Sequence, residues 1–263
     1  MGVLQRNYLP ADLEPLLRSE AMDGSIVVQA RQCLDETRWL LQLAKENSFI
    51  RGVVGWVDLC SPNVAGELEE FAAYRRLAGV RHVLQDEPDD GFMLRSEFRR
   101  GIAQLARFGQ VYDILIYPRH LPAAVELVRQ FPSQPFVLDH IAKPGIAEGL
   151  LEPWASGIRE LARCPNVACK VSGMITEARW VNWSPKDFYP YLDVVLESFG
   201  PERLMIGSDW PVCLLSGSYQ AAIGVVKEYA AHLTSSERDA LFGGTCARIY
   251  GVPADAPQRM QSL

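Results

Sequence analysis

The sequence predicts an α/β protein built as a (β/α)8 barrel (TIM barrel) that lacks its first strand. Short apolar runs rich in β-branched residues alternate with segments of helical periodicity along the chain, and this alternation is typical of a parallel sheet covered by helices. A doubly wound nucleotide-binding sheet would carry G-x-G-x-x-G or G-x-x-x-x-G-K-[ST] after a strand, and neither pattern occurs. The barrel is therefore the better prediction, as a single domain over residues 1–263 that is incomplete at its N-terminal end.

Seven apolar runs predict seven strands. They cover residues 26–30, 53–59, 79–84, 111–116, 135–141, 167–172 and 203–209. An eight-stranded barrel of roughly 250 residues needs one strand more. A helix is predicted over Pro10–Ser19, ahead of the first run, so the missing strand is the one that would precede this helix.

The segments between the runs show helical spacing. Residues 35–47 place Trp39, Leu40 and Leu43 on one face, and residues 122–131 have the same periodicity. Residues that commonly begin or end helices mark further boundaries: an N-cap at Ser184, a capping box at Thr234 and Glu237, and C-terminal caps at Gly200 and Gly243.

Charge and composition narrow the class of protein. The chain has 26 Lys and Arg against 32 Asp and Glu, a net charge of −6, and without clustered basic residues it is not expected to bind nucleic acid. No apolar run approaches the roughly 18 residues of a membrane-spanning helix, and the first residues lack the pattern of a secretion signal. The six cysteines include no C-x-x-C pair. We therefore expect a cytoplasmic protein with neither nucleic acid nor a membrane as its partner.

Candidate catalytic residues follow the predicted strands, because a parallel barrel carries its active site at the C-terminal ends of its strands. Asp209 closes the last run with a carboxylate that is costly to bury without a partner. His140 closes the fifth run with an imidazole. His82, Lys170 and Tyr117 lie at or just beyond the ends of three other runs.

Each candidate also has a structural interpretation. Asp209 would cap the loop after its strand, and His140 would be a core histidine bonded to the backbone. His82 and Lys170 would form ion pairs with neighbouring strands. The residues alone leave both interpretations open, and they favour a functional role most strongly for Asp209.

Four segments together resemble one enzyme family. They are GVRHVLQDEP at residues 79–88, FVLDHIAKP at 136–144, CKVSG at 169–173 and GSDWPV at 207–212. Over nearly its whole length the chain resembles the amidohydrolase-2 family, in the branch of sugar-acid lactonases and pyrone-dicarboxylate lactonases. The resemblance implies a barrel hydrolase that opens a small sugar-acid lactone, a cyclic carboxylic ester.

The resemblance also implies roles for the candidates. Asp209 would act as general base toward a water molecule, and His140 with His82 would polarise the lactone carbonyl. The remaining candidates would bind the substrate: Lys170 and Arg81 through its hydroxyl or carboxylate groups, and Tyr117 as part of an aromatic wall. Because Arg81 and His82 are adjacent in one strand, only one of them can face the barrel interior.

One departure from the family pattern concerns the metal. Family members carry a His-x-His pair on the first strand, and this sequence has none. We therefore expect either one divalent metal, zinc or manganese, with His140 and Asp209 among its ligands, or no metal. Two alternatives remain beside lactone hydrolysis: a metal-dependent decarboxylase of the same superfamily, and a shortened protein that is catalytically weak or inactive.

Overall fold

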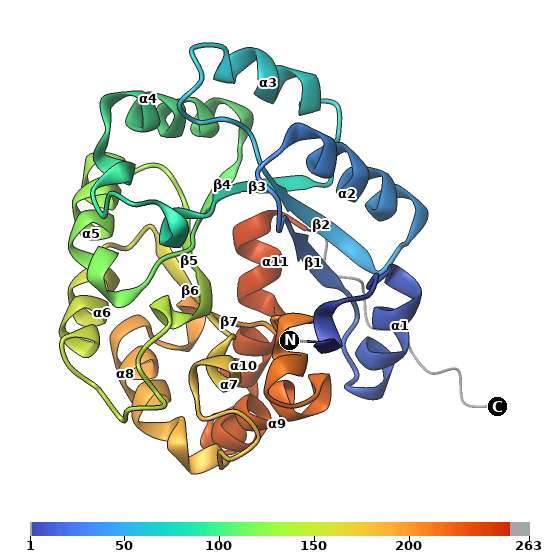
Figure 1. The fold of residues 1–263 in the computed structure, drawn as a ribbon, viewed down its shortest axis with the longest axis vertical. Coiled ribbons are helices and arrows are strands. Elements are labelled where there is room, and N and C mark those ends of the chain that lie inside the picture. Colours follow the sequence, from blue (N-terminus) through green and yellow to red (C-terminus); the bar gives the residue numbers. More distant parts are fainter. Residues whose placement is uncertain (1, 253–263) are drawn as a thin grey trace.

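A parallel sheet of seven strands forms the centre of the molecule. The computed structural model describes residues 2–252. The strands pair in sequence order, each parallel to the next, and they are β1 (Ser25–Val28), β2 (Ile50–Gly55), β3 (Leu77–His82), β4 (Val111–Ile114), β5 (Phe136–Leu138), β6 (Val167–Val171) and β7 (Leu204–Ile206). The sheet curls around a central axis (Figure 1). The predicted seven-stranded α/β barrel is confirmed.

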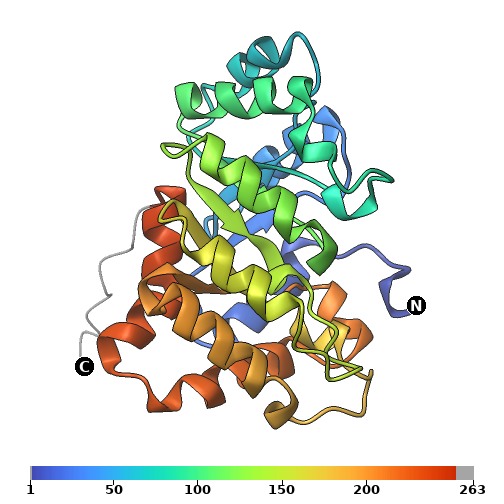
Figure 2. The same cartoon turned by 90° about the vertical axis from the view of Figure 1, so that its left-hand side faces the viewer.

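Most of the helices form a ring outside the sheet, whereas α11 lies over the centre of the barrel (Figure 1). The helices are α1 (Pro10–Ser19), α2 (Leu34–Glu46), α3 (Val64–Phe71), α4 (Ser96–Leu105), α5 (Leu121–Gln130), α6 (Trp154–Ala162), α7 (Met174–Glu177), α8 (Tyr189–Phe199), α9 (Tyr219–Tyr229), α10 (Ser235–Asp239) and α11 (Thr245–Tyr250). The last of these, α11, lies on the side of the sheet opposite the N-terminal segment (Figure 2). Every helix in the described chain is too short or too polar to span a bilayer.

The helix-end predictions have mixed outcomes. Thr234 accepts a hydrogen bond from the backbone of Glu237 and caps α10 as predicted, and Gly200 ends α8 with a φ of 69°. Gly243 is not a cap, because it lies inside a helical turn over Ala240–Gly244 that continues directly into α11. Trp39 was expected on the buried face of α2, yet it is 47% exposed.

All seven strands end one to four residues before the predicted ends of their apolar runs, and two of these early ends shape the candidate site. The strand β5 stops at Leu138 and β7 stops at Ile206, three residues short of the predicted ends in both cases. The reason is local backbone geometry: residues 140–143 and Asp209 have positive φ values, and a left-handed residue turns the chain away from the ladder. His140 and Asp209 therefore lie in turns beyond their strands.

Alternate residues of each strand pack on opposite faces. Outward side chains such as Tyr112 and Leu138 join the large cluster formed with the helices. Inward side chains such as Val54, Val137 and Ala168 form a smaller interior layer that includes Tyr250 of α11. The helix α11 thus covers one end of the barrel interior. The C-terminal ends of the strands and their loops form the opposite end.

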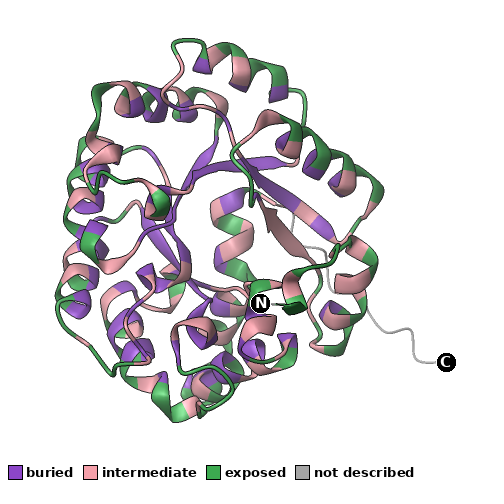
Figure 3. Ribbon diagram, in the orientation of Figure 1, coloured by how far each residue is buried: buried purple, intermediate pink, exposed green. Residues whose placement is uncertain are grey.

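The sheet is open between β7 and β1. Each of these two strands pairs with one neighbour only among the described residues. On the outside of this gap, Leu17 of α1 packs with Tyr219 and Ile223 of α9, and with the partly buried Ile206 of β7. Every residue of β1 is only partly buried (Figure 3). The eighth strand expected from the sequence, and with it the incompleteness of the domain, stays a prediction.

Candidate active site

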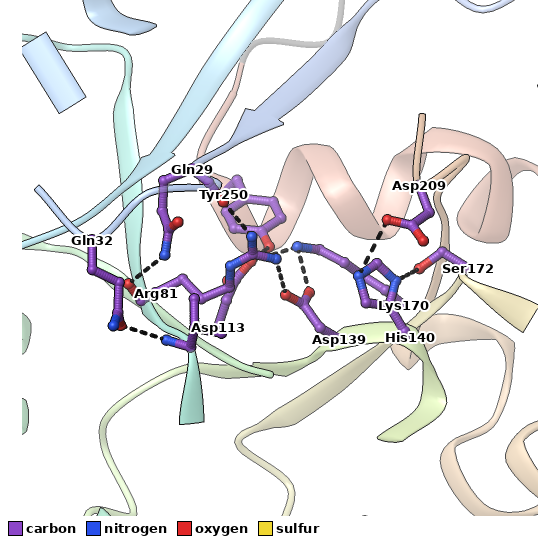
Figure 4. Close-up of polar contacts among 11 residues, drawn as sticks. Gln29, Gln32, Arg81, Asp113, Asp139, His140, Lys170, Ser172, Asp209 and Tyr250 are labelled. Carbon is purple, nitrogen blue, oxygen red and sulfur yellow. Dashed lines mark hydrogen bonds and ion pairs between the residues drawn. The ribbon is translucent and has the colours of Figure 1, made fainter. Parts of the chain in front are cut away.

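Three polar side chains from the ends of neighbouring strands meet at one mouth of the barrel (Figure 4). His140 Nε2 lies 3.6 Å from Asp209 Oδ1, and His140 Nδ1 lies 2.8 Å from Ser172 Oγ. The side chains of His140 and Asp209 are 12% and 17% exposed, respectively. The imidazole is thus held on one side by a buried hydroxyl and faces a partly accessible carboxylate on the other.

The local backbone explains how His140 reaches this position. Strand alternation predicted that His140 would share a face with Phe136 and Leu138, but these two residues point outward into the helix layer. Instead, His140 begins a run of four left-handed residues after the strand has ended. Gly173 lies against its ring, and a Cβ added there would lie 2.8 Å from His140 Cγ. Any larger residue at position 173 would therefore displace the imidazole.

The burial of His140 sets its protonation. Removal from water lowers the pKa of His140, although the nearby Asp209 carboxylate opposes this effect. A lowered pKa keeps the imidazole neutral near neutral pH, so one ring nitrogen carries a proton and the other accepts a hydrogen bond. The hydroxyl of Ser172 is the hydrogen-bond partner of Nδ1, which leaves Nε2 directed at Asp209.

Beneath the mouth, four charged side chains form a buried network. Arg81 Nη1 and Lys170 Nζ each lie 2.8 Å from an oxygen of Asp139. Lys170 also pairs with Asp113, and Tyr250 donates its hydroxyl hydrogen to Asp113 at 2.8 Å. Two cations balance two anions, as a buried ionic network requires.

The pKa values of the two carboxylates in this network are shifted in opposite directions. Burial raises the pKa of Asp113 to about 6, against the attraction of Lys170. At Asp139 burial acts in the same direction, but the charges of Lys170 and Arg81 outweigh it and hold the pKa below its ordinary value. Asp139 is therefore the permanent anion of the network.

The structure resolves which of Arg81 and His82 faces inward. Arg81 points into the barrel and donates to Asp139 and to the carbonyl oxygen of Gln29. His82 points outward, bonds Glu87 at 2.7 Å and stacks on Phe92. This corrects the expectation that His82 would join His140 at the carbonyl, because strand alternation admits only one of the two side chains to the interior.

The other predicted substrate-binding residues lie at different depths. Lys170 and Arg81 are only 9% exposed and form ion pairs with carboxylates, which for Lys170 matches the ion-pair alternative. Tyr117 is partly buried beyond β4, with the Arg119 guanidinium 5.0 Å and Lys143 Nζ 5.5 Å from its ring centre. Contact of these residues with substrate stays a prediction.

Sequence reasoning missed Ser172 at the mouth and the two carboxylates of the buried network beneath it, Asp139 and Asp113. Asp113 has an inward position within β4, Asp139 directly follows β5, and Ser172 directly follows β6. A usable signal was present, since two inward cations, Arg81 in β3 and Lys170 in β6, require inward anions nearby.

Comparison with known proteins identifies the family. The amidohydrolase family model matches residues 2–252. The chain belongs to the amidohydrolase family. It is 43% identical to an L-fucono-1,5-lactonase of Burkholderia multivorans, over 99% of this chain and 91% of that protein. It is 35% identical to an L-fucono-1,5-lactonase of Burkholderia ambifaria, over 96% of this chain and 88% of the relative.

A solved structure shares the whole architecture. An amidohydrolase from Burkholderia multivorans, crystallised with bound zinc, superposes with a TM-score of 0.91 at 45% identity, covering 96% of this chain and 92% of the other. The amidohydrolase barrel is thus the fold of this chain.

The zinc in that amidohydrolase raises the question of whether the described residues fit a metal. A catalytic zinc is generally bound by three protein ligands and a water molecule. His140 and Asp209 are close enough to share one ion, but residues 2–252 contain no group of three or more His, Cys, Asp or Glu side chains placed to hold one. The described donor set does not fit a complete catalytic metal site, so the mechanism below uses no metal.

Proposed function

We propose that this amidohydrolase hydrolyses a sugar-acid lactone, with Asp209 as general base and His140 as the hydrogen-bond donor to the carbonyl. Two observations support the proposal. The two relatives named above are L-fucono-1,5-lactonases at 43% and 35% identity over nearly the whole chain. The pair of His140 and Asp209 stands at the C-terminal ends of the strands, where barrel enzymes carry their catalytic groups.

The first step is attack by water. A water molecule hydrogen-bonded to Asp209 gives a proton to the carboxylate while its oxygen forms a bond to the carbonyl carbon of the lactone. The electron pair of the carbonyl moves onto its oxygen, which accepts a hydrogen bond from Nε2–H of His140. The 2.8 Å contact between Ser172 Oγ and His140 Nδ1 suits a hydroxyl that donates to the ring, and the mechanism uses this tautomer, in which the ring proton is on Nε2.

The second step opens the ring. The tetrahedral intermediate collapses, the bond between the former carbonyl carbon and the ring oxygen breaks, and protonated Asp209 returns its proton to the departing alkoxide. The product is an open-chain hydroxy acid, and Asp209 is again ionised. Asp209 therefore acts first as a base and then as an acid, which requires it to remain in contact with solvent and substrate.

The observation that carries this proposal is the 3.6 Å separation of His140 Nε2 and Asp209 Oδ1 at a partly accessible mouth. Two groups at that distance can contact one water molecule and one carbonyl group together. Asp209 alone would be a capping residue, and His140 alone would be a satisfied core histidine.

The test is a direct assay of the purified chain. Acid release from L-fucono-1,5-lactone and from five- and six-membered lactones of other sugar acids is followed with a pH indicator, after subtraction of spontaneous ring opening. Parallel samples are prepared as purified, with a chelator and with added zinc. We expect saturable acid release above background. No acceleration with any lactone in any sample would overturn the proposal.

A further inference from the structure

The backbone that presents His140 has a conformation that ordinary side chains avoid. His140, Ile141, Ala142 and Lys143 have φ values of 51°, 47°, 59° and 49°. Left-handed residues that are not glycine are uncommon, and four in succession persist only where the surroundings fix them. The turn at residues 140–143 therefore needs anchors outside itself.

The strongest anchor is the residue immediately before the turn. Asp139 is fully buried, and its two oxygens lie 2.8 Å from Arg81 Nη1 and 2.8 Å from Lys170 Nζ. These partners come from β3 and β6, on the two sides of β5 along the sheet. The carboxylate of Asp139 is thus held from both directions. Because His140 is the next residue in the chain, fixing Asp139 also fixes where the backbone of His140 begins.

The far side of the turn has weaker support. Trp154 Nε1 donates to the carbonyl oxygen of Ile141 at 2.6 Å, and the amide of Lys143 donates to the carbonyl oxygen of His140 at 2.8 Å. Both bonds orient the peptide groups after His140. Neither one fixes where the turn leaves the strand.

We propose that Asp139 is a positioning residue for the reaction: clamped between Arg81 and Lys170, it fixes the left-handed turn that aims His140 Nε2 at Asp209. This inference rests on the proposed function. It assigns Arg81 and Lys170 to the support of His140 from within the barrel.

Asp113 provides a matched control. Like Asp139 it is fully buried, and it also pairs with Lys170. Its second partner, however, is Tyr250 of α11 at the other end of the barrel. Asp139→Asn and Asp113→Asn therefore each remove one buried anion from the same lysine, and only Asp139→Asn releases the turn at His140.

The experiment compares these two variants in the 263-residue chain. We expect Asp139→Asn to lower kcat about tenfold or more, because small misplacements of a catalytic group are costly, while KM changes less than twofold. Asp113→Asn should keep kcat within about twofold of the wild type at a temperature where both variants are fully folded. Equal losses of kcat in the two variants, or an unchanged kcat in Asp139→Asn, would overturn the proposal.

A second measurement does not depend on turnover. The ring ¹⁵N signals of His140, assigned among the four histidines with a His140→Asn variant, are recorded at one fixed pH. Their chemical shifts should change in Asp139→Asn and stay the same in Asp113→Asn. The reverse pattern, or no change in either variant, contradicts the proposal. If the wild type hydrolyses no lactone, the proposed function fails, and the ring signals still decide the positioning role.

Asp139→Asn risks failing to fold, since it leaves buried cations short of a partner. Arg81→Lys then replaces it, because lysine keeps the charge but cannot reach both Asp139 and the Gln29 carbonyl. The same displacement of the His140 ring signals is expected, with a smaller loss of kcat. Unchanged ring signals in Arg81→Lys would contradict the proposal.

Discussion

The closed part of the sheet and its open edge differ in how they hold the proposed catalytic pair, His140 and Asp209. Every residue of β3 to β6 is buried, and the inward positions there carry a neutralised ionic network. At the edge, all of β1 is only partly buried, and β7 is a three-residue strand that pairs on one side only within residues 2–252. His140 comes from the closed part and Asp209 from the edge. In the proposed mechanism the hydrogen-bond donor thus belongs to the more buried part of the sheet, and the base belongs to the less buried edge.

The largest effect should separate two histidines of the closed part. His140→Asn should lower turnover of the lactone by roughly 10²-fold or more, the usual cost of losing one donor to an oxyanion. His82→Asn should lower it by less than about tenfold, since His82 faces the helix layer and bonds Glu87. Steady-state kinetics of the two variants at equal folded fraction make the comparison. Equal losses would place His82 back in the catalytic site.

The same Val→Ala substitution, made once in the closed part of the sheet and once at its open edge, measures how the packing of the two parts differs. Val137 of β5 is fully buried and Val28 of β1 is partly buried, and both contact the same interior layer. Val137→Ala should lower the free energy of unfolding by about 2 kcal/mol, and Val28→Ala by about half of that or less. Urea unfolding of both variants supplies the values. A larger loss at Val28 would show that the edge is packed as firmly as the centre.

Amide hydrogen exchange compares the backbone stability of the closed part of the sheet with that of its open edge. Amides of β4, which lies between two partner strands, should exchange at least roughly tenfold more slowly than amides of β1, a difference of about 1.4 kcal/mol in opening. Mass spectrometry of peptides covering residues 25–28 and 111–114 is sufficient. Equal protection would mean that β1 is covered by a further strand or by another chain.

The smallest expected effect concerns pH. Because burial raises the pKa of Asp113 to about 6, its folded-state pKa exceeds the unfolded one, and the stability it contributes at low pH is lost as the pH rises through about 6. Asp113→Asn lacks this dependence. Its loss of unfolding free energy relative to the wild type should therefore be greater at pH 5 than at pH 8, by about 1 kcal/mol. A difference of opposite sign would show that Lys170 keeps Asp113 ionised.

The seven strands were predictable because each is a short apolar run that must be buried on both faces. The ends of these runs were less predictable, since left-handed residues at 140–143 and at Asp209 carry no mark in the sequence. Had His140 continued β5, it would have pointed outward with Leu138. The turn that brings it to the mouth depends on Asp139, Arg81 and Lys170, and these meet only in the folded chain.

The site itself was predictable in part. His140 and Asp209 were expected at one mouth of the barrel, and the structure places them 3.6 Å apart. The inward direction of Arg81 could not be decided from β3 alone, because Arg81 and His82 are both polar. The partners available in the folded chain decide it: Arg81 pairs with Asp139 in the interior, and the ring of His82 stacks on Phe92 outside.

The central claim is that Asp209 is the general base, and the kcat of Asp209→Asn tests it most directly. The variant keeps the size of the side chain and removes only the basic oxygen. After thermal unfolding has shown that wild type and variant are equally folded, lactone hydrolysis is measured with both at saturating substrate. We expect kcat to fall by about a hundredfold or more, within the range of roughly 10²–10⁴ that general-base assistance contributes. A kcat within threefold or so of the wild type would contradict the account and place the base elsewhere.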